Sequence, residues 1–201
     1  ESEDHIWTYL SSVSNTIMLK DIIERHDIRN VPFLNNLLAF YADTTGKLTS
    51  ANSIAKYMKS QGESISSNLV LLYRSFYEES YLLNAVPRYD IHGKKLLESN
   101  EKIYWDDLGL RNLKAEGGMD SYIEKAIENA AYKHLCFLWY KVQVGILGAG
   151  EVDFVCTKPN ETVYVQVTYI MGEQATRERE FGPLEKIRDN YPKYVISMTP
   201  L

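Results

Sequence analysis

Glu151-Val-Asp-Phe-Val-Cys156 and Val163-Tyr-Val-Gln-Val-Thr168 are the two stretches that decide how the chain folds. Both are rich in β-branched and aromatic residues, and each carries one polar side chain, Asp153 or Gln166, in an apolar setting. Because Lys158-Pro-Asn-Glu161 between them consists largely of turn-forming residues, the two stretches are predicted to form a β-hairpin. Such a hairpin would hold two oxygen-bearing side chains next to each other, the minimum needed to bind a divalent cation.

The segment around this hairpin has the pattern of a small α/β domain, which we place at residues 119–201. A helix is predicted at about 120–140, followed by strands, a charged helical segment and a final strand, at 142–147, 151–157, 162–168, 175–190 and 193–198. A right-handed crossover through the second helix would place the last strand parallel to its partner, so the sheet is expected to be mixed.

The residues before this segment indicate a helical domain, 1–114. Two short helices separated by a small turn, at 54–58 and 69–81, are typical of a helix-turn-helix. Strand-like runs at 82–89 and 102–105 then flank a turn, in the form of a wing. Residues 30–110 are therefore predicted to form a winged helix, and Ala115-Glu-Gly-Gly118 is the expected linker.

A winged helix suggests contact with duplex DNA. The start of its second helix would enter a major groove and the wing tip would meet phosphates, through Ser66, Ser67, Asn68, Arg74, Lys94 and Lys95. However, winged helices also act as protein–protein modules, and basic and acidic residues nearly balance between positions 51 and 114. Since phosphate contacts dominate nucleic-acid affinity, this balance of charge gives only weak support for DNA binding.

Composition excludes several classes of protein. The 201 residues carry a net charge of −5, which argues against indiscriminate nucleic-acid binding, and no apolar run reaches membrane-spanning length. The two cysteines have no metal-site spacing and are expected to be small core residues, which favours a reducing cytoplasm. The chain begins with Glu1 rather than Met, as expected of a trimmed product or a piece of a longer protein.

The element order of residues 119–201 resembles the core of the PD-(D/E)XK nucleases. In that fold the second strand supplies an Asp, matched here by Asp153, and the first helix often supplies a Glu, matched by Glu128. The third strand supplies (E/Q)-x-K, which here reads Gln166-Val-Thr168. The resemblance implies an α+β protein, with an N-terminal helical winged-helix region followed by a small α/β restriction-endonuclease-like domain. Its Mg²⁺ ligands, if it is active, would be Asp153 and Glu128.

Thr168 is a departure from the pattern of active members, which carry a Lys at that position. That Lys orients the metal-bound water and stabilises charge that builds on the phosphate. Lys158 or Lys186 could take its place only if the fold brought one of them there. We therefore expect a non-catalytic module with vestigial nuclease positions at Glu128, Asp153, Gln166 and Thr168. The alternative is a Mg²⁺-dependent DNA endonuclease that retains activity through Glu128, Asp153 and Gln166.

Phrases spread over nearly the whole chain resemble the C-terminal half of a family of bacterial and archaeal AAA+ superfamily ATPases. They include Val86-Pro-Arg-Tyr-Asp90, Asp106-Asp-Leu-Gly-Leu-Arg111, Glu151-Val-Asp-Phe154 and Asn190-Tyr-Pro-Lys-Tyr194. In that family a P-loop ATPase module precedes this half, which is a domain of unknown function. The resemblance implies that ATP binds only in that N-terminal module, which would be the partner of this chain within one polypeptide. Duplex DNA and a second copy of the chain are further candidate partners.

Overall fold

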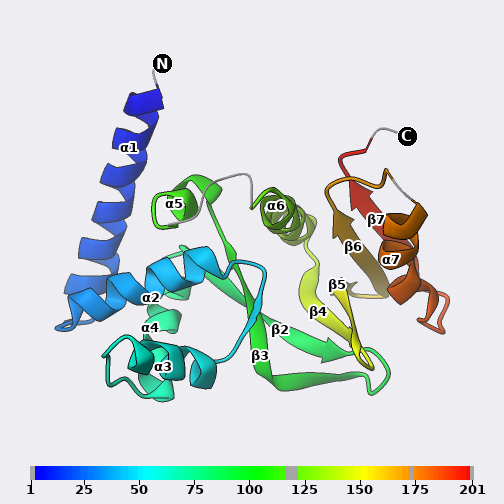
Figure 1. The fold of residues 1–201 in the computed structure, drawn as a ribbon, viewed down its shortest axis with the longest axis horizontal. Coiled ribbons are helices and arrows are strands. Elements are labelled where there is room, and N and C mark those ends of the chain that lie inside the picture. The colour runs from blue at the N-terminus through cyan, green and yellow to red at the C-terminus, as the bar shows by residue number, and fades with distance from the viewer. Residues whose placement is uncertain (1–2, 116–121, 173, 200–201) are drawn as a thin grey trace. The chain divides into compact units, whose positions relative to one another are not determined.

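The computed structural model describes residues 3–115, 122–172 and 174–199 (Figure 1). The chain is a mixed α+β protein with a mixed sheet, as predicted. It divides into two compact units, one made of Glu1–Ala85 and Ile103–Gly118 and the other of Val86–Lys102 and Met119–Leu201. Most of the predicted linker, residues 116–118, lies outside the described residues.

The first unit is mainly helical. Its elements are α1 (Glu3–Thr16), η1 (Ile17–Glu24, a π-helix), α2 (Val31–Asp43), β1 (Leu48–Thr49), α3 (Ala51–Ser60), α4 (Ser67–Glu79) and α5 (Leu108–Asn112). Side-chain caps set where several of these helices begin. Asn30 accepts a hydrogen bond from the Phe33 backbone N–H at the start of α2, and Ser50 and Ser53 form a reciprocal capping box at the start of α3.

The core of the first unit joins α2 to α4. Phe33, Leu34, Leu37, Tyr41 and Tyr77 are all nearly inaccessible to solvent. The Tyr77 hydroxyl donates a hydrogen bond to the Leu34 carbonyl oxygen, so the polar end of this buried ring is satisfied within the core. Burial raises the pKa of Tyr77 well above its ordinary value, and the hydroxyl therefore stays protonated and can donate.

Tyr77→Phe is expected to lower the free energy of unfolding by about 1–2 kcal/mol, because it removes a buried hydrogen bond and keeps the ring. Tyr57→Phe is the matched control, since Tyr57 is half exposed and its loss of a hydroxyl should cost less than about 0.5 kcal/mol. Urea unfolding followed by circular dichroism measures both. Equal effects of the two substitutions would contradict a structural role for the Tyr77 hydroxyl.

The hairpin predicted as a wing is divided between the two units. It consists of β2 (Leu83–Asp90) and β3 (Lys95–Trp105), and its part from Val86 to Lys102 groups with the second unit. There β2 pairs in parallel with β4 (Lys141–Leu147), with Arg88 opposite Val144 and Asp90 opposite Ile146. The pairing supplies hydrogen-bond partners to the free edge of β4, which explains why the hairpin joins this sheet.

The second unit is built on the sheet order β3-β2-β4-β5-β6-β7 (Figure 1). Besides β4 it contains β5 (Gly150–Lys158), β6 (Glu161–Thr168) and β7 (Lys193–Ser197). The predicted hairpin is confirmed, because β5 and β6 are antiparallel with Lys158 opposite Glu161. Asn160 takes a φ of 63° in its two-residue turn, a conformation that Asn tolerates. The parallel pairing expected for the last strand is also observed, between β6 and β7.

Two helices, α6 (Ile123–Phe137) and α7 (Gln174–Glu185), cover opposite faces of this sheet. Tyr132 of α6 packs against Phe154, whereas Leu184 of α7 shares a buried cluster with Val155. Because neighbouring residues of a strand point to opposite faces, the two helices lie on opposite sides. The β4–β5 register shifts between Val152 and Val155, which both belong to the α7-side cluster, so simple alternation does not place Asp153. Its contact with Lys102, which also contacts Glu128 of α6, places it on the α6 side. None of the described helices has the length and apolarity that crossing a membrane requires.

Candidate functional site

A lysine that the sequence analysis did not single out lies at the centre of the acidic residues of the second unit. Lys102, on β3, has a side chain that is only 3% exposed. Its Nζ lies 2.8 Å from Glu128 Oε1, 2.6 Å from Glu151 Oε1 and 3.5 Å from Asp153 Oδ1. We call these four residues the lysine–carboxylate centre. A buried ammonium requires such partners, because an unpaired charge would be too costly to remove from water.

The members reach the centre from three elements, β3, α6 and β5. Lys102 is a buried residue of β3, in the part of the strand that groups with the second unit. Glu128 lies on the buried face of α6, where Lys125 of the preceding turn also contacts it, at 2.6 Å from Oε2. Glu151 and Asp153 are two residues apart on β5 and therefore point to the same face.

Asp153 and Gln166 are neighbours, as the hairpin predicted. Each side chain accepts a hydrogen bond from a backbone N–H group of the opposite strand. Asp153 Oδ2 accepts a hydrogen bond from the Val167 backbone N–H at 2.8 Å, and Gln166 Oε1 accepts one from the Asp153 backbone N–H at 3.2 Å. Gln166 Nε2 donates to Glu180 Oε2 on α7. The Gln166 amide therefore ties β5 to α7, with both of its ends occupied.

The centre shifts the pKa of its members in different directions. Burial would lower the pKa of Lys102, but the charges of Glu128, Asp153 and Glu151 outweigh it and raise that pKa. Burial would raise the pKa of Glu128, but Lys102 and Lys125 outweigh it and lower that pKa. For Asp153, burial together with the Glu128 charge prevails over Lys102 and raises the pKa to about 6. Lys102 is therefore charged, and Asp153 is the member poised to take up a proton.

The proposed metal ligands, Asp153 and Glu128, do not form a cation site in this arrangement. Among the described residues, no group of three or more His, Cys, Asp or Glu side chains is placed to hold a metal ion. The reason is visible in the geometry, because the Lys102 ammonium lies where the carboxylate oxygens converge. The residues present thus fit an internal ammonium rather than Mg²⁺.

The other residues considered for the catalytic lysine lie elsewhere. Thr168 is buried at the end of β6 and carries no charge. Lys158 pairs with Glu161 across the hairpin turn and lies over the Tyr140 ring, and Lys186 is exposed. Lys102 is the lysine whose ammonium contacts all three carboxylates of the centre. Its sequence signal is a lysine directly before the apolar run Ile103-Tyr-Trp105, and that pattern does not reveal its partners.

The predicted DNA-contacting residues are spread over both units. Ser66 caps α4 by accepting a hydrogen bond from the Leu69 backbone N–H, and Asn68 is exposed in the first turn of the helix. Ser67 is half-buried between them. Arg74 is mostly buried, with Nε 3.6 Å from Glu78 Oε2, so its charge is offset within the same helix. Leu71 and Leu72 are the large apolar side chains that α4 exposes.

Lys94, in the turn between β2 and β3, and Lys95, the first residue of β3, are both exposed where the wing tip was predicted. They belong to the second unit, whereas α4 belongs to the first. The structure thus assigns the predicted recognition helix and the predicted wing tip to different compact units.

The fold and the lysine–carboxylate centre define a mixed α+β protein with a charge-compensated acidic site. Residues 1–120 match DUF8612, a domain of unknown function, and the chain belongs to this family. The chain is also 32% identical over 190 residues to an uncharacterized protein of Haemophilus influenzae, an alignment that covers 94% of this chain and 46% of that protein. The chain therefore spans about half the length of the curated relative it matches. No solved structure matches the chain significantly.

Proposed function

We propose that this chain is a non-catalytic DNA- or protein-interaction module of a larger AAA+ superfamily ATPase. In this proposal a winged helix precedes a nuclease-like α/β domain whose centre no longer cleaves. The observation that carries it is the position of the Lys102 ammonium, within 2.8 Å of Glu128 and 2.6 Å of Glu151. The α6-β4-β5-β6-α7-β7 order supports the nuclease-like assignment, and the half-length match to the relative is compatible with a further module.

The electrostatic cost of adding a metal ion supports the loss of catalysis. A divalent cation about 4 Å from a buried ammonium would be repelled by about 8 kcal/mol at an effective dielectric constant of about 20. Glu128 also has its second oxygen paired with Lys125, and Gln166 contributes no charge. With its carboxylates already compensated, the centre has little attraction left for Mg²⁺.

A protein partner is the better-supported occupant of the first unit's exposed helix. Leu71 and Leu72 are 41% and 49% exposed on α4, whereas Arg74 is paired with Glu78. A helix that enters a major groove is expected to present cationic and hydrogen-bonding side chains rather than leucines. This face of α4 therefore suits an apolar surface of another protein better than DNA.

The second candidate is the Mg²⁺-dependent endonuclease, and one observation favours it. Lys102 places a lysine beside Asp153 and Glu128, so β3 supplies the residue type that Thr168 lacks. In this alternative the ammonium would leave Glu128 and Glu151 when substrate arrives and would face the attacked phosphate.

Cleavage assays separate the two functions. Supercoiled plasmid and single-stranded DNA are incubated with the purified chain and millimolar Mg²⁺ or Mn²⁺, and we expect no cleavage above that of Asp153→Ala. Asp153→Ala serves as the control because it removes the central carboxylate. Cleavage by the wild-type chain that both Asp153→Ala and Lys102→Met abolish would overturn the non-catalytic proposal and establish the endonuclease.

A further inference from the structure

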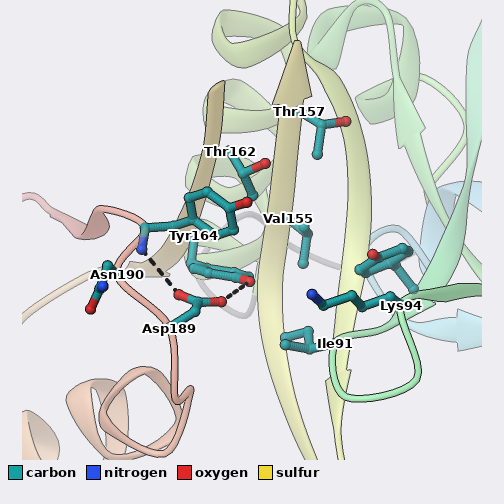
Figure 2. Close-up of a pocket in the computed structure, with 10 residues that line it drawn as sticks. Ile91, Lys94, Val155, Thr157, Thr162, Tyr164, Asp189 and Asn190 are labelled. Carbon is teal, nitrogen blue, oxygen red and sulfur yellow. Dashed lines mark hydrogen bonds between the residues drawn. The ribbon is translucent and has the colours of Figure 1, made fainter. Parts of the chain in front are cut away.

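A pocket of about 460 Å³ opens on the α7-covered face of the second unit's sheet, away from the lysine–carboxylate centre (Figure 2). The β5–β6 hairpin forms its floor with Val155 and Tyr164, and the hydroxyls of Thr157 and Thr162 lie beside them. The end of β2 and its following turn contribute Tyr89 and Lys94, and the loop after α7 contributes Tyr191. Its volume is within the range of pockets that bind small ligands.

Lys94 supplies the positive charge of this pocket, and hydrogen bonds within its turn fix the backbone that carries it. Asp90 Oδ1 accepts hydrogen bonds from the backbone N–H groups of His92 and Gly93, at 3.1 and 3.0 Å. A Cβ at residue 93 would lie 2.5 Å from Asp90 Oδ2, so a larger residue there would displace the Asp90 carboxylate. The Lys94 side chain extends into the pocket toward Tyr164 and Asp189 (Figure 2). Among the residues that the structure describes, Lys94 forms no ion pair, so its charge is available to a ligand.

The carboxylate on the opposite wall is already occupied. Asp189 accepts hydrogen bonds from the Tyr164 hydroxyl at 2.6 Å and from the Tyr191 backbone N–H at 3.1 Å. Lys193 Nζ lies 3.3 Å from Asp189 Oδ1 and so compensates the charge of this carboxylate. Asp189 thus shapes the wall and orients Tyr164, and a ligand cation would find no free carboxylate there.

Aromatic rings supply the rest of the recognition surface. The Tyr164 and Tyr191 rings lie 6.4 Å apart between centroids and are tilted by 54°. Tyr164 is buried with its hydroxyl fixed, whereas Tyr191 is 49% exposed and can present a ring face to a ligand. Tyr89 is half-buried beside Lys94. Ring faces next to a free ammonium suit a planar group joined to an anion.

We propose that this pocket binds one nucleotide, with its phosphate at Lys94 and its base stacked on Tyr191. A metal ion would be repelled by Lys94, a purely apolar ligand would strand the threonine hydroxyls, and inorganic phosphate alone would leave the tyrosines unused. The nucleotide is either a free mononucleotide or one unit of a single strand. Duplex DNA is a poor fit, because its bases are stacked on each other and offer no free face. The site goes beyond the interaction module proposed above and does not depend on it.

The test uses the full chain and a fluorescein-labelled oligothymidylate, with fluorescence anisotropy measured at low salt in EDTA. Lys94→Glu and Tyr191→Ala are each expected to weaken binding about tenfold, as removal of a phosphate contact or a stacking platform does. The controls are Lys95→Glu, which makes the same change of charge at the neighbouring exposed lysine, and Tyr194→Ala, which removes another exposed tyrosine near Tyr191. Both controls are expected to bind within about twofold of the wild type.

Competition with thymidine monophosphate identifies the source of the nucleotide. Displacement of the oligomer by the monophosphate at a similar nucleotide concentration indicates a mononucleotide site, and failure to displace it indicates a single-strand site. Absence of oligomer and monophosphate binding, or equal losses in Lys94→Glu and Lys95→Glu, would overturn the proposal. Gel analysis of the same oligomer after addition of Mg²⁺ reports cleavage separately, so the non-catalytic proposal fails or stands on a different readout.

Discussion

Lys102→Met is expected to lower the free energy of unfolding by about 3–5 kcal/mol, the cost of removing one partner from a buried charge cluster. The substitution keeps much of the side-chain volume and takes the positive charge away from Glu128, Glu151 and Asp153. The carboxylates are then left close together in the interior, where like charges raise each other's pKa. Urea unfolding at pH 7 measures the loss, which should become smaller at pH 5 as the carboxylates take up protons.

Lys125→Met is the matched control for this prediction. Lys125 also contacts Glu128, at 2.6 Å, but its side chain is 33% exposed, so water replaces much of what the ammonium provided. Its loss should cost about 1 kcal/mol or less. Comparable losses of unfolding free energy in Lys102→Met and Lys125→Met would show that burial of the Lys102 ammonium does not increase its contribution to stability.

The same pair of variants tests whether the ammonium takes the place of a metal ion. Millimolar Mn²⁺ is expected to raise the melting temperature of Lys102→Met, because carboxylates without a counter-ion attract a divalent cation. The wild type should not respond, since its centre is already compensated by Lys102. If Mn²⁺ raised the melting temperature of the wild type but not of Asp153→Ala, the lysine–carboxylate centre would bind metal despite Lys102. That result would favour the endonuclease.

Local sequence patterns predicted the elements that are closed by short turns. The β5–β6 hairpin followed from Lys158-Pro-Asn-Glu161, and its two polar residues, Asp153 and Gln166, are adjacent as expected. Turn chemistry and alternation are properties of a few consecutive residues, which explains this success. The same reasoning could not determine which atoms these two side chains would bind, because Glu180 and Lys102 come from distant elements.

Lys102 was missed for the same physical reason. Its hydrogen-bond partner Glu128 is 26 residues away, and no local pattern pairs the two. Placing Lys102 also depends on the parallel register between Arg88–Asp90 of β2 and Val144–Ile146 of β4. Parallel strands are joined by long connections, so their register is set by the packed sheet rather than by turn residues. The winged-helix interpretation of the hairpin therefore did not predict the pairing of β2 with β4.

Asp153→Asn is expected to remove a pH dependence of stability that the wild type shows between about pH 4 and pH 6. Burial raises the pKa of Asp153 to about 6 in the folded state, against about 3.9 for an unfolded chain. Between these values the folded state holds a proton that the unfolded state has lost, so the contribution of this group falls as pH rises and is flat above pH 6. The shift corresponds to about 2–3 kcal/mol.

Urea unfolding of both proteins from pH 4 to pH 8 measures this difference. The stability of Asp153→Asn relative to wild type should increase by about 2–3 kcal/mol as pH rises from 4 to 7, because the amide carries no charge to desolvate.

Asp189→Asn is a control of opposite sign. Burial raises the pKa of Asp189, but hydrogen bonds from Tyr164 and Tyr191 outweigh it and lower that pKa. Its carboxylate therefore stabilises the fold once ionised. The free energy of unfolding of Asp189→Asn should fall relative to that of the wild type as pH rises through the acid range. Parallel profiles for wild type and Asp153→Asn would mean that Lys102 fully compensates Asp153, and the proton-accepting role assigned to this carboxyl would be wrong.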